Sequence, residues 1–356
     1  DAWTMRTRFL LALTPLLALA SAPALAAPLQ GRAPDVNAYP KQASFPEVLR
    51  DCSVGAPEEL FDVLRVIDGD TLWVEREGQR EKLRLLSVDT EEKFMERELS
   101  PSKPSTRYGD LVTGWTQGFF TPRSPEAGPV RVGLRFPGGV EQRDVYGRLL
   151  CHVITEEGVD FNLLLVRMGL SPYFNKYGHS RLDHERFAAH QAKAMAEKRG
   201  VWNAETNKSG KKRPYARLLP WWEARGAAVH AFRELAAADP AHWIAADEPE
   251  ALEMSMKAAP GEEVTLLCIV DRFFDEDDGS RTVLLRGGDK RRSVRVRIEP
   301  EALEAMAKVD LEGSKEDFRQ NYLTVKGTLA VGKRGFDLVG VEPGDWRRAG
   351  PEPVFK

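Results

Sequence analysis

The sequence predicts an α+β protein with two separate β-rich units. Between residues 60 and 203 the expected order is strands, a helix, more strands and then helices, and not the strand–helix alternation of a parallel sheet. A second run of strands is expected between residues 261 and 346. The chain has 356 residues, 42% of them hydrophobic and 29% charged, which is enough apolar sequence for two soluble globular cores.

The first unit should begin with three strands, because apolar and β-branched residues are separated there by two turn signals, Asp68-Gly69-Asp70 and Glu77-Gly78-Gln79. A Pro- and Ser-containing loop follows. The next segment is predicted to be a helix, since Leu111, Trp115 and Phe119 have helical spacing. The predicted strands are 60–67, 71–76, 82–88, 130–136 and 147–154, and the predicted helices are 110–120, 162–168 and 180–198.

Residues 204–260 are expected to form a basic linker and a helical spacer. A helix is predicted at 218–237, with Trp221, Trp222 and Phe232 on its apolar side. A basic run such as this linker is usually a solvated segment, although in a nuclease it could also follow a phosphate backbone. Its cationic residues are Lys208, Lys211, Lys212, Arg213 and Arg217.

The second unit is expected to be an OB-fold-like barrel, because five strands with one helix between the third and the fourth follow the OB-fold order. The strands are predicted at 264–270, 281–285, 293–298, 322–331 and 336–341, and the helix at 299–308. Its basic side chains favour single-stranded nucleic acid as a ligand. A solvated face, or a face for a protein or sugar polymer, is the alternative. These side chains are Arg291, Arg292, Arg295, Arg297, Lys333 and Arg334.

Residues 1–26 have the features of a secretory signal peptide. Arg6 and Arg8 precede an apolar run, and Ala24-Leu25-Ala26 predicts cleavage before Ala27. We therefore expect a secreted or periplasmic protein with no membrane anchor after cleavage. Residues 27–59 should be an extended leader, and residues 347–356 a C-terminal tail.

Export implies an oxidising compartment, in which one disulfide could form among the three cysteines. The predicted pair is Cys52 with Cys151. Three buried thiols, including Cys268, are the alternative.

Three short stretches carry the chemistry of the first unit: Val66 to Thr71, Arg84 to Glu92, and Asp144 to Arg148. They supply carboxylates and arginines at strand ends, which suits binding of a hard divalent cation beside a phosphate and attack on that phosphate by water. Asp70 and Asp89 should converge because each follows a strand. Arg84 lies five residues before Asp89, so strand alternation alone would place it on the opposite face.

These stretches resemble those of the staphylococcal nuclease (thermonuclease) family. The likeness runs from about Leu60 to Trp202 and includes Tyr108-Gly109, the segment Leu165 to Leu170, and Gly200-Val201-Trp202. It implies a five-stranded OB-like barrel with three helices for a nuclease domain at 60–203, followed by the OB-like domain at 261–346.

The resemblance also implies roles for individual residues. Asp70, Asp89 and the carbonyl of Thr90 would ligate Ca²⁺. Glu92 would be the general base, acting on a bound water, and Arg84 and Arg148 would hold the scissile phosphate. Asp68 would support the turn.

The chain departs from the family at Glu91, where the family usually has Pro. Loss of Pro removes a fixed φ and adds a second carboxylate, so either Glu91 or Glu92 could serve as the base, with Glu92 favoured by its spacing. The predicted activity is Ca²⁺-dependent hydrolysis of DNA, RNA or both. The alternative is a non-catalytic two-barrel protein that binds nucleic acid or a surface partner.

Overall fold

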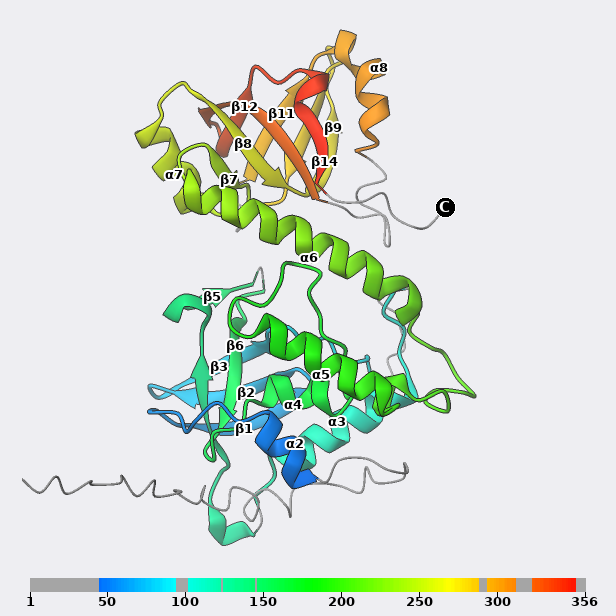
Figure 1. Cartoon of the computed structure of the whole chain (residues 1–356). Coiled ribbons are helices and arrows are strands. Elements are labelled where there is room, and N and C mark those ends of the chain that lie inside the picture. The colour runs from blue at the N-terminus through cyan, green and yellow to red at the C-terminus, as the bar shows by residue number, and fades with distance from the viewer. Residues whose placement is uncertain are drawn as a thin grey trace, which may run out of the picture.

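The computed structural model describes residues 45–93, 102–122, 124–144, 146–287, 293–311 and 322–349. The predicted signal peptide, most of the leader and the end of the tail lie outside these ranges. The described chain forms two β-sheets on either side of the long helix α6 (Tyr215–Ala238), as Figure 1 shows. No helix in the described part is both long and apolar enough to cross a membrane.

The first sheet closes into a barrel, as predicted. Its strands follow the order β3-β2-β1-β4-β6, and a parallel pairing of β3 with β6 joins the two ends. Strand β5 pairs with β6 outside this five-stranded ring. The strands are β1 (Phe61–Asp68), β2 (Thr71–Arg76), β3 (Gln79–Leu85), β4 (Arg131–Arg135), β5 (Gln142–Arg143) and β6 (Leu149–Thr155).

Helices surround this barrel and share its core. Helix α3 begins three residues before the predicted start, because the hydroxyl of Thr106 accepts a hydrogen bond from the amide of Gly109 and caps the helix there. The helices are α2 (Phe45–Asp51), α3 (Arg107–Phe119), α4 (Phe161–Arg167) and α5 (His184–Ala196). The observed α+β class therefore confirms the prediction for the first unit.

Two expectations near the N-terminal end of the described chain were wrong. Residues 45–51 form helix α2 and not an extended leader, because Val48 and Leu49 are buried in the barrel core. Cys52 and Cys151 do not form a disulfide, and the alternative of three buried thiols is confirmed. Both are free, buried thiols, as is Cys268.

The second sheet contains the five predicted strands and also three strands that were not predicted, and the prediction of a second barrel is wrong. The sheet is open, with strand order β7-β8-β12-β13-β11-β10-β9, and β14 pairs with β12. Strand β8 ends at Cys268 and β9 begins at Val270, so these two strands are joined by the chain and not by a ladder of hydrogen bonds. The strands are β7 (Trp243–Ala245), β8 (Glu263–Cys268), β9 (Val270–Asp275), β10 (Arg281–Leu285), β11 (Ser293–Ile298), β12 (Tyr322–Gly332), β13 (Gly335–Val339) and β14 (Trp346–Ala349), with helices α7 (Pro249–Ala258) and α8 (Leu303–Met306).

Helix α6 packs against both units. Near its start, Leu218 and Trp222 form a small buried cluster with Phe174 of the first unit. Further along, Phe232 packs with Leu267 of β8. The helix is therefore a shared layer between the sheets, and its first turns lie close to the loops that carry the motifs.

Candidate active site

Asp70 and Thr90 bring together two strand ends that are distant in sequence. Asp70 lies in the turn between β1 and β2, where its amide donates to the carboxylate of Asp68 over 3.1 Å. Its Oδ2 accepts from the amide of Thr90 at 2.8 Å and from the hydroxyl of Thr90 at 3.1 Å. A Cβ at Gly69 would lie 2.6 Å from the Thr90 side chain, so only glycine fits this approach.

Arg84 lies between the two aspartates that were predicted to bind a metal. One guanidinium nitrogen forms an ion pair with Asp70, and another donates to Asp89 Oδ1 over 2.8 Å. The alternation argument placed Arg84 on the opposite face, but β3 ends at Leu85 and Ser87 has a φ of +63°. The chain therefore turns before Asp89, and alternation does not extend to it.

Asp89 is buried and faces three cations. Besides Arg84, the ammonium of Lys103 lies 2.9 Å from Oδ1, and the guanidinium of Arg213 binds Oδ2. Burial alone would raise the pKa of Asp89, but Lys103, Arg213 and Arg84 outweigh it and hold the pKa far below its usual range. Asp89 is therefore an ionised carboxylate at neutral pH.

Glu92 is linked to Asp89 through Lys103. The Lys103 ammonium is 2.5 Å from Glu92 Oε1, so one cation bridges both carboxylates. The backbone of Glu92 is fixed by the start of α3, since its carbonyl accepts from the amide of Thr106 at 3.0 Å. Its side chain keeps 18% exposure, so the carboxylate remains accessible.

Glu91 has a different environment from Glu92. Glu91 as a whole is only 3% exposed. One carboxylate oxygen accepts from the hydroxyl of Thr106 and, at 2.7 Å, from the amide of Asn207. The other accepts from the hydroxyl of Tyr215 at 3.0 Å. Both oxygens are therefore occupied by donors, two of which come from the linker and α6.

Arg148 comes directly before β6, the strand that pairs with the strand of Arg84, but it makes different contacts from Arg84. Arg84 pairs with Leu150 across β3 and β6, and Arg148 is two residues before Leu150. Its guanidinium donates to Asp144 at 2.7 Å and lies over the ring of Tyr146. Within the described part of the chain, no contact joins Arg148 to Asp70, Asp89 or Glu92.

The donors of this site fit a hard cation. Asp70, Asp89 and Glu92 offer carboxylate oxygens, the ligand type that Ca²⁺ prefers. The Lys103 ammonium already bridges the carboxylates of Asp89 and Glu92, so the space between these two carboxylates favours a positive charge. The contacts of Thr90 recorded here are those of its amide and hydroxyl with Asp70.

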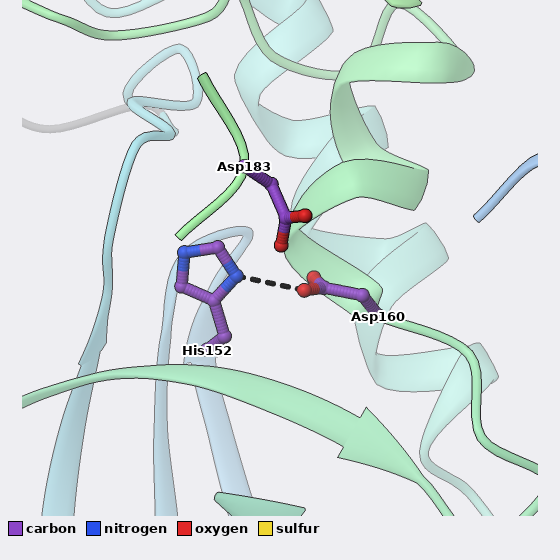
Figure 2. Close-up of side chains that lie close together, drawn as sticks. All are labelled: His152, Asp160 and Asp183. Carbon is purple, nitrogen blue, oxygen red and sulfur yellow. Dashed lines mark hydrogen bonds and ion pairs between the residues drawn. The ribbon is translucent and has the colours of Figure 1, made fainter. Parts of the chain in front are cut away.

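A second group with metal-ligating side chains lies elsewhere in the first unit. Figure 2 shows His152, Asp160 and Asp183, whose ligand atoms lie within 4.8 Å of one another. The Asp160 carboxylate caps α4 through the amide of Leu163 and binds Nδ1 of His152 at 2.7 Å, and Asp183 forms an ion pair with Arg135. These partners explain the group as structural, and its spacing in sequence gave no sign of it.

Sequence reasoning missed Lys103 and the role of Arg213 in this site. Lys103 lies in a loop of low periodicity, and Arg213 was predicted only as one charge of a basic linker. A pocket of about 380 Å³ lined by residues such as Pro57, Phe61 and Leu134 contains none of the predicted site residues. The candidate site is therefore the carboxylate–cation cluster itself.

Part of the chain is similar to known nucleases. Residues 82–204 match the family model described as "Staphylococcal nuclease homologue". The chain is 32% identical over 141 residues to "Endonuclease YhcR" of Bacillus subtilis, covering 39% of this chain and 11% of the relative. It is 29% identical over 151 residues to the thermonuclease of Staphylococcus hyicus (42% and 78%), and 34% identical over 113 residues to that of Staphylococcus intermedius (32% and 58%).

Residues 82–204 are thus similar to domains of the staphylococcal nuclease type, and the relatives that match part of the chain are named as nucleases. The chain spans less than two thirds of the length of two of these three relatives, 11% of one and 58% of the other. The family match includes Arg84, Asp89, Glu92 and Arg148. It ends before Arg213 and begins after Asp70.

Proposed function

We propose that the protein is a Ca²⁺-dependent nuclease that hydrolyses phosphodiester bonds of DNA, RNA or both. The observation that carries this proposal is the position of Arg84, which joins the two predicted metal ligands, Asp70 and Asp89, beside Glu92. Attack by water on a phosphate needs carboxylates that bind a metal ion, an arginine that binds the phosphate, and an accessible carboxylate that takes a proton from the water.

Asp70, Asp89 and the carbonyl of Thr90 would hold Ca²⁺, which supplies positive charge to the phosphate oxygens when it is bound. Glu92 would take a proton from the attacking water. Arg84 and Arg148 would donate hydrogen bonds to the phosphate, in exchange for their present carboxylate partners, and would stabilise the charge of the transition state. Glu92 is favoured as the base over Glu91, because both oxygens of Glu91 already accept hydrogen bonds.

The test is cleavage of single-stranded DNA and of RNA by the chain from Ala27, with Ca²⁺ and with a chelator. Arg84→Ala and Arg148→Ala should each lower the rate by about 10²–10³-fold, because each removes a cationic donor to the phosphate. Arg80→Ala is the matched control, since Arg80 is exposed on the same strand as Arg84. Near-normal turnover in either of the first two variants, with the fold intact, would contradict the assignment.

Export is part of the proposal and is supported by the basic and apolar character of residues 1–26. The N-terminal sequence of the protein recovered from its native compartment should begin at Ala27. A protein that retains residues before Ala27 inside the cell would exclude a secreted or periplasmic location.

Binding of single-stranded nucleic acid by the C-terminal sheet is a weaker proposal. Arg295 pairs with Asp337, and Arg297 pairs with Asp278 and Glu299, so both charges are neutralised by neighbours. Arg291 and Arg292 lie outside the described residues. If deletion of residues 218–356 leaves the affinity for single strands unchanged, this role of the second sheet is wrong.

A further inference from the structure

The linker that follows the family domain forms part of the wall of the active site. Asn207 binds the carboxylate of Glu91 and accepts a hydrogen bond from the amide of Tyr108 at 3.1 Å. Tyr215, at the start of α6, donates to the other oxygen of Glu91. Glu91 is the residue that replaces the usual Pro of the family, so the departure from the family pattern coincides with an anchor for this segment.

Arg213 lies between Asn207 and Tyr215 in the sequence, and its side chain is buried in the site. Its side chain is only 3% exposed. The guanidinium binds Asp89 Oδ2, and it also donates to the carbonyl of Asp89 at 2.9 Å and to the carbonyl of Ser102 at 3.1 Å. The ring of Trp222 lies 5.1 Å from it. Two carbonyl acceptors and an aromatic face would hold this cation in place even when Asp89 binds another partner.

Lys103 is held differently on the other side of the same carboxylate. Its recorded partners are Asp89 Oδ1 and Glu92 Oε1, and its side chain is 24% exposed. A partly exposed ammonium on a flexible stem can move into solvent when a cation binds, whereas a buried guanidinium with backbone acceptors cannot. Once Lys103 has moved and Arg84, which also donates to Oδ1, has turned to the phosphate, Asp89 would offer Oδ1 to a metal while Oδ2 stays on Arg213.

We propose that Arg213 is a positioning residue of the nuclease site, which fixes Oδ2 of Asp89 so that Oδ1 faces the bound cation, and whose charge weakens the binding of that cation. The inference rests on the proposed function. It has two parts with opposite effects. Loss of Arg213 leaves the carboxylate free to rotate, which lowers turnover, and it removes a like charge beside the cation, which strengthens cation binding.

The experiment uses the full chain from Ala27 and measures calcium affinity by titration calorimetry with CaCl₂ and turnover by cleavage of single-stranded DNA. Arg213→Met should bind Ca²⁺ about tenfold more tightly or better and should cleave about tenfold more slowly or worse. A loosened fold would weaken both properties together. Lys212→Met, at the exposed neighbouring position, should leave the calcium affinity within about twofold of wild type.

Arg213→Lys separates charge from geometry, because an ammonium keeps the charge but cannot reach the carboxylate and both carbonyls at once. It should keep a calcium affinity near that of wild type, with turnover reduced about tenfold. Wild-type turnover in Arg213→Lys, or unchanged or weaker calcium binding in a folded Arg213→Met, would overturn the inference while leaving the nuclease proposal intact. If the wild-type chain neither binds Ca²⁺ nor cleaves, the proposed function fails and the inference fails with it.

Discussion

Two adjacent glutamates in this protein have opposite environments. The Glu91 carboxylate is buried under three donors from Thr106, Asn207 and Tyr215, whereas Glu92 is partly exposed and bridged to Asp89 by Lys103. Neighbouring residues of one chemical type can therefore be divided between a structural and a chemical role. The surroundings of each carboxylate, and not the residue type, separate the two roles.

Replacement of Glu91 by Gln tests the structural role. Gln keeps the shape but puts an amide donor against groups that already donate, so about 1–3 kcal/mol of the free energy of unfolding should be lost. Denaturation by urea, with Glu92→Gln as the control, measures this. Equal stability of Glu91→Gln and the wild-type protein would show that the three contacts of Glu91 do not hold the linker.

His190 makes the stability of the first unit depend on pH. Burial, and next the charge of Arg186, lower the pKa of His190 to about 4, against an ordinary value of 6.5. The unfolded chain therefore binds the proton first as the pH falls, so this contribution to stability is present above pH 6.5 and is lost between about 6.5 and 4.

The check is thermal unfolding across this pH range. His190→Gln keeps a donor for the carbonyl of Asp51, which His190 Nε2 contacts at 3.1 Å, and should lose part of the pH dependence. The same slope in both proteins would assign the dependence to other groups.

At the scale of elements, the sequence predicted local features. The turn signals around Gly69 and Gly78 predicted the three strands β1 to β3 within a few residues, and the strand ends predicted that Asp70 and Asp89 converge. Arg84 was expected beside them only from the family resemblance, since alternation placed it on the opposite face. Helix α2 was missed because its stability comes from burial of Val48 and Leu49 in a core shared with elements distant in sequence, such as α4.

The partners of the site carboxylates were missed for the same reason. Arg213 reaches Asp89 across 124 residues, and no local pattern of apolar or charged side chains encodes such a contact. The sequence pattern also did not reveal that the second sheet is open, because element order predicts which strands exist and not which edges form hydrogen bonds.

Helix α3 supports the active site through a close backbone approach. A Cβ at Gly109 would lie 2.1 Å from the carbonyl oxygen of Glu92, whereas one at Gly114 would meet nothing within 4 Å. Gly109→Ala should therefore push the loop of Glu92 away, at a cost of about 1–3 kcal/mol and with loss of turnover. Gly114→Ala, in the same helix, should gain about 0.5–1 kcal/mol.

The check is to measure the free energy of unfolding and the rate of cleavage for Gly109→Ala and Gly114→Ala. If Gly109→Ala behaves like Gly114→Ala, the position of Glu92 does not depend on contact with α3.

At the scale of the whole molecule, helix α6 makes the first unit larger than the family domain. The family match ends at residue 204, but Arg213, Tyr215 and Trp222 complete the surroundings of Asp89 and Glu91. The same helix carries Phe232 into the second sheet. We therefore expect the smallest active unit to include the linker and α6.

Two truncated chains test this expectation. A chain that ends after Ala238 keeps the contacts of Arg213 and Tyr215 and should cleave, whereas a chain that ends after Ala204 lacks them and should unfold at lower temperature with little cleavage. Thermal unfolding and cleavage should be measured on both. Equal stability and activity of the two chains would show that the linker is dispensable.

The most direct test of the account is calcium-dependent cleavage of single-stranded DNA by wild-type, Glu92→Gln and Glu91→Gln chains. We expect cleavage by the wild-type chain with Ca²⁺ and none with chelator. Glu92→Gln should lose about 10²–10⁴-fold in turnover, because it cannot take the proton from water. Glu91→Gln should retain turnover while it stays folded. Loss only in Glu91→Gln would move the base by one residue, and no cleavage by the folded wild-type chain would contradict the nuclease assignment.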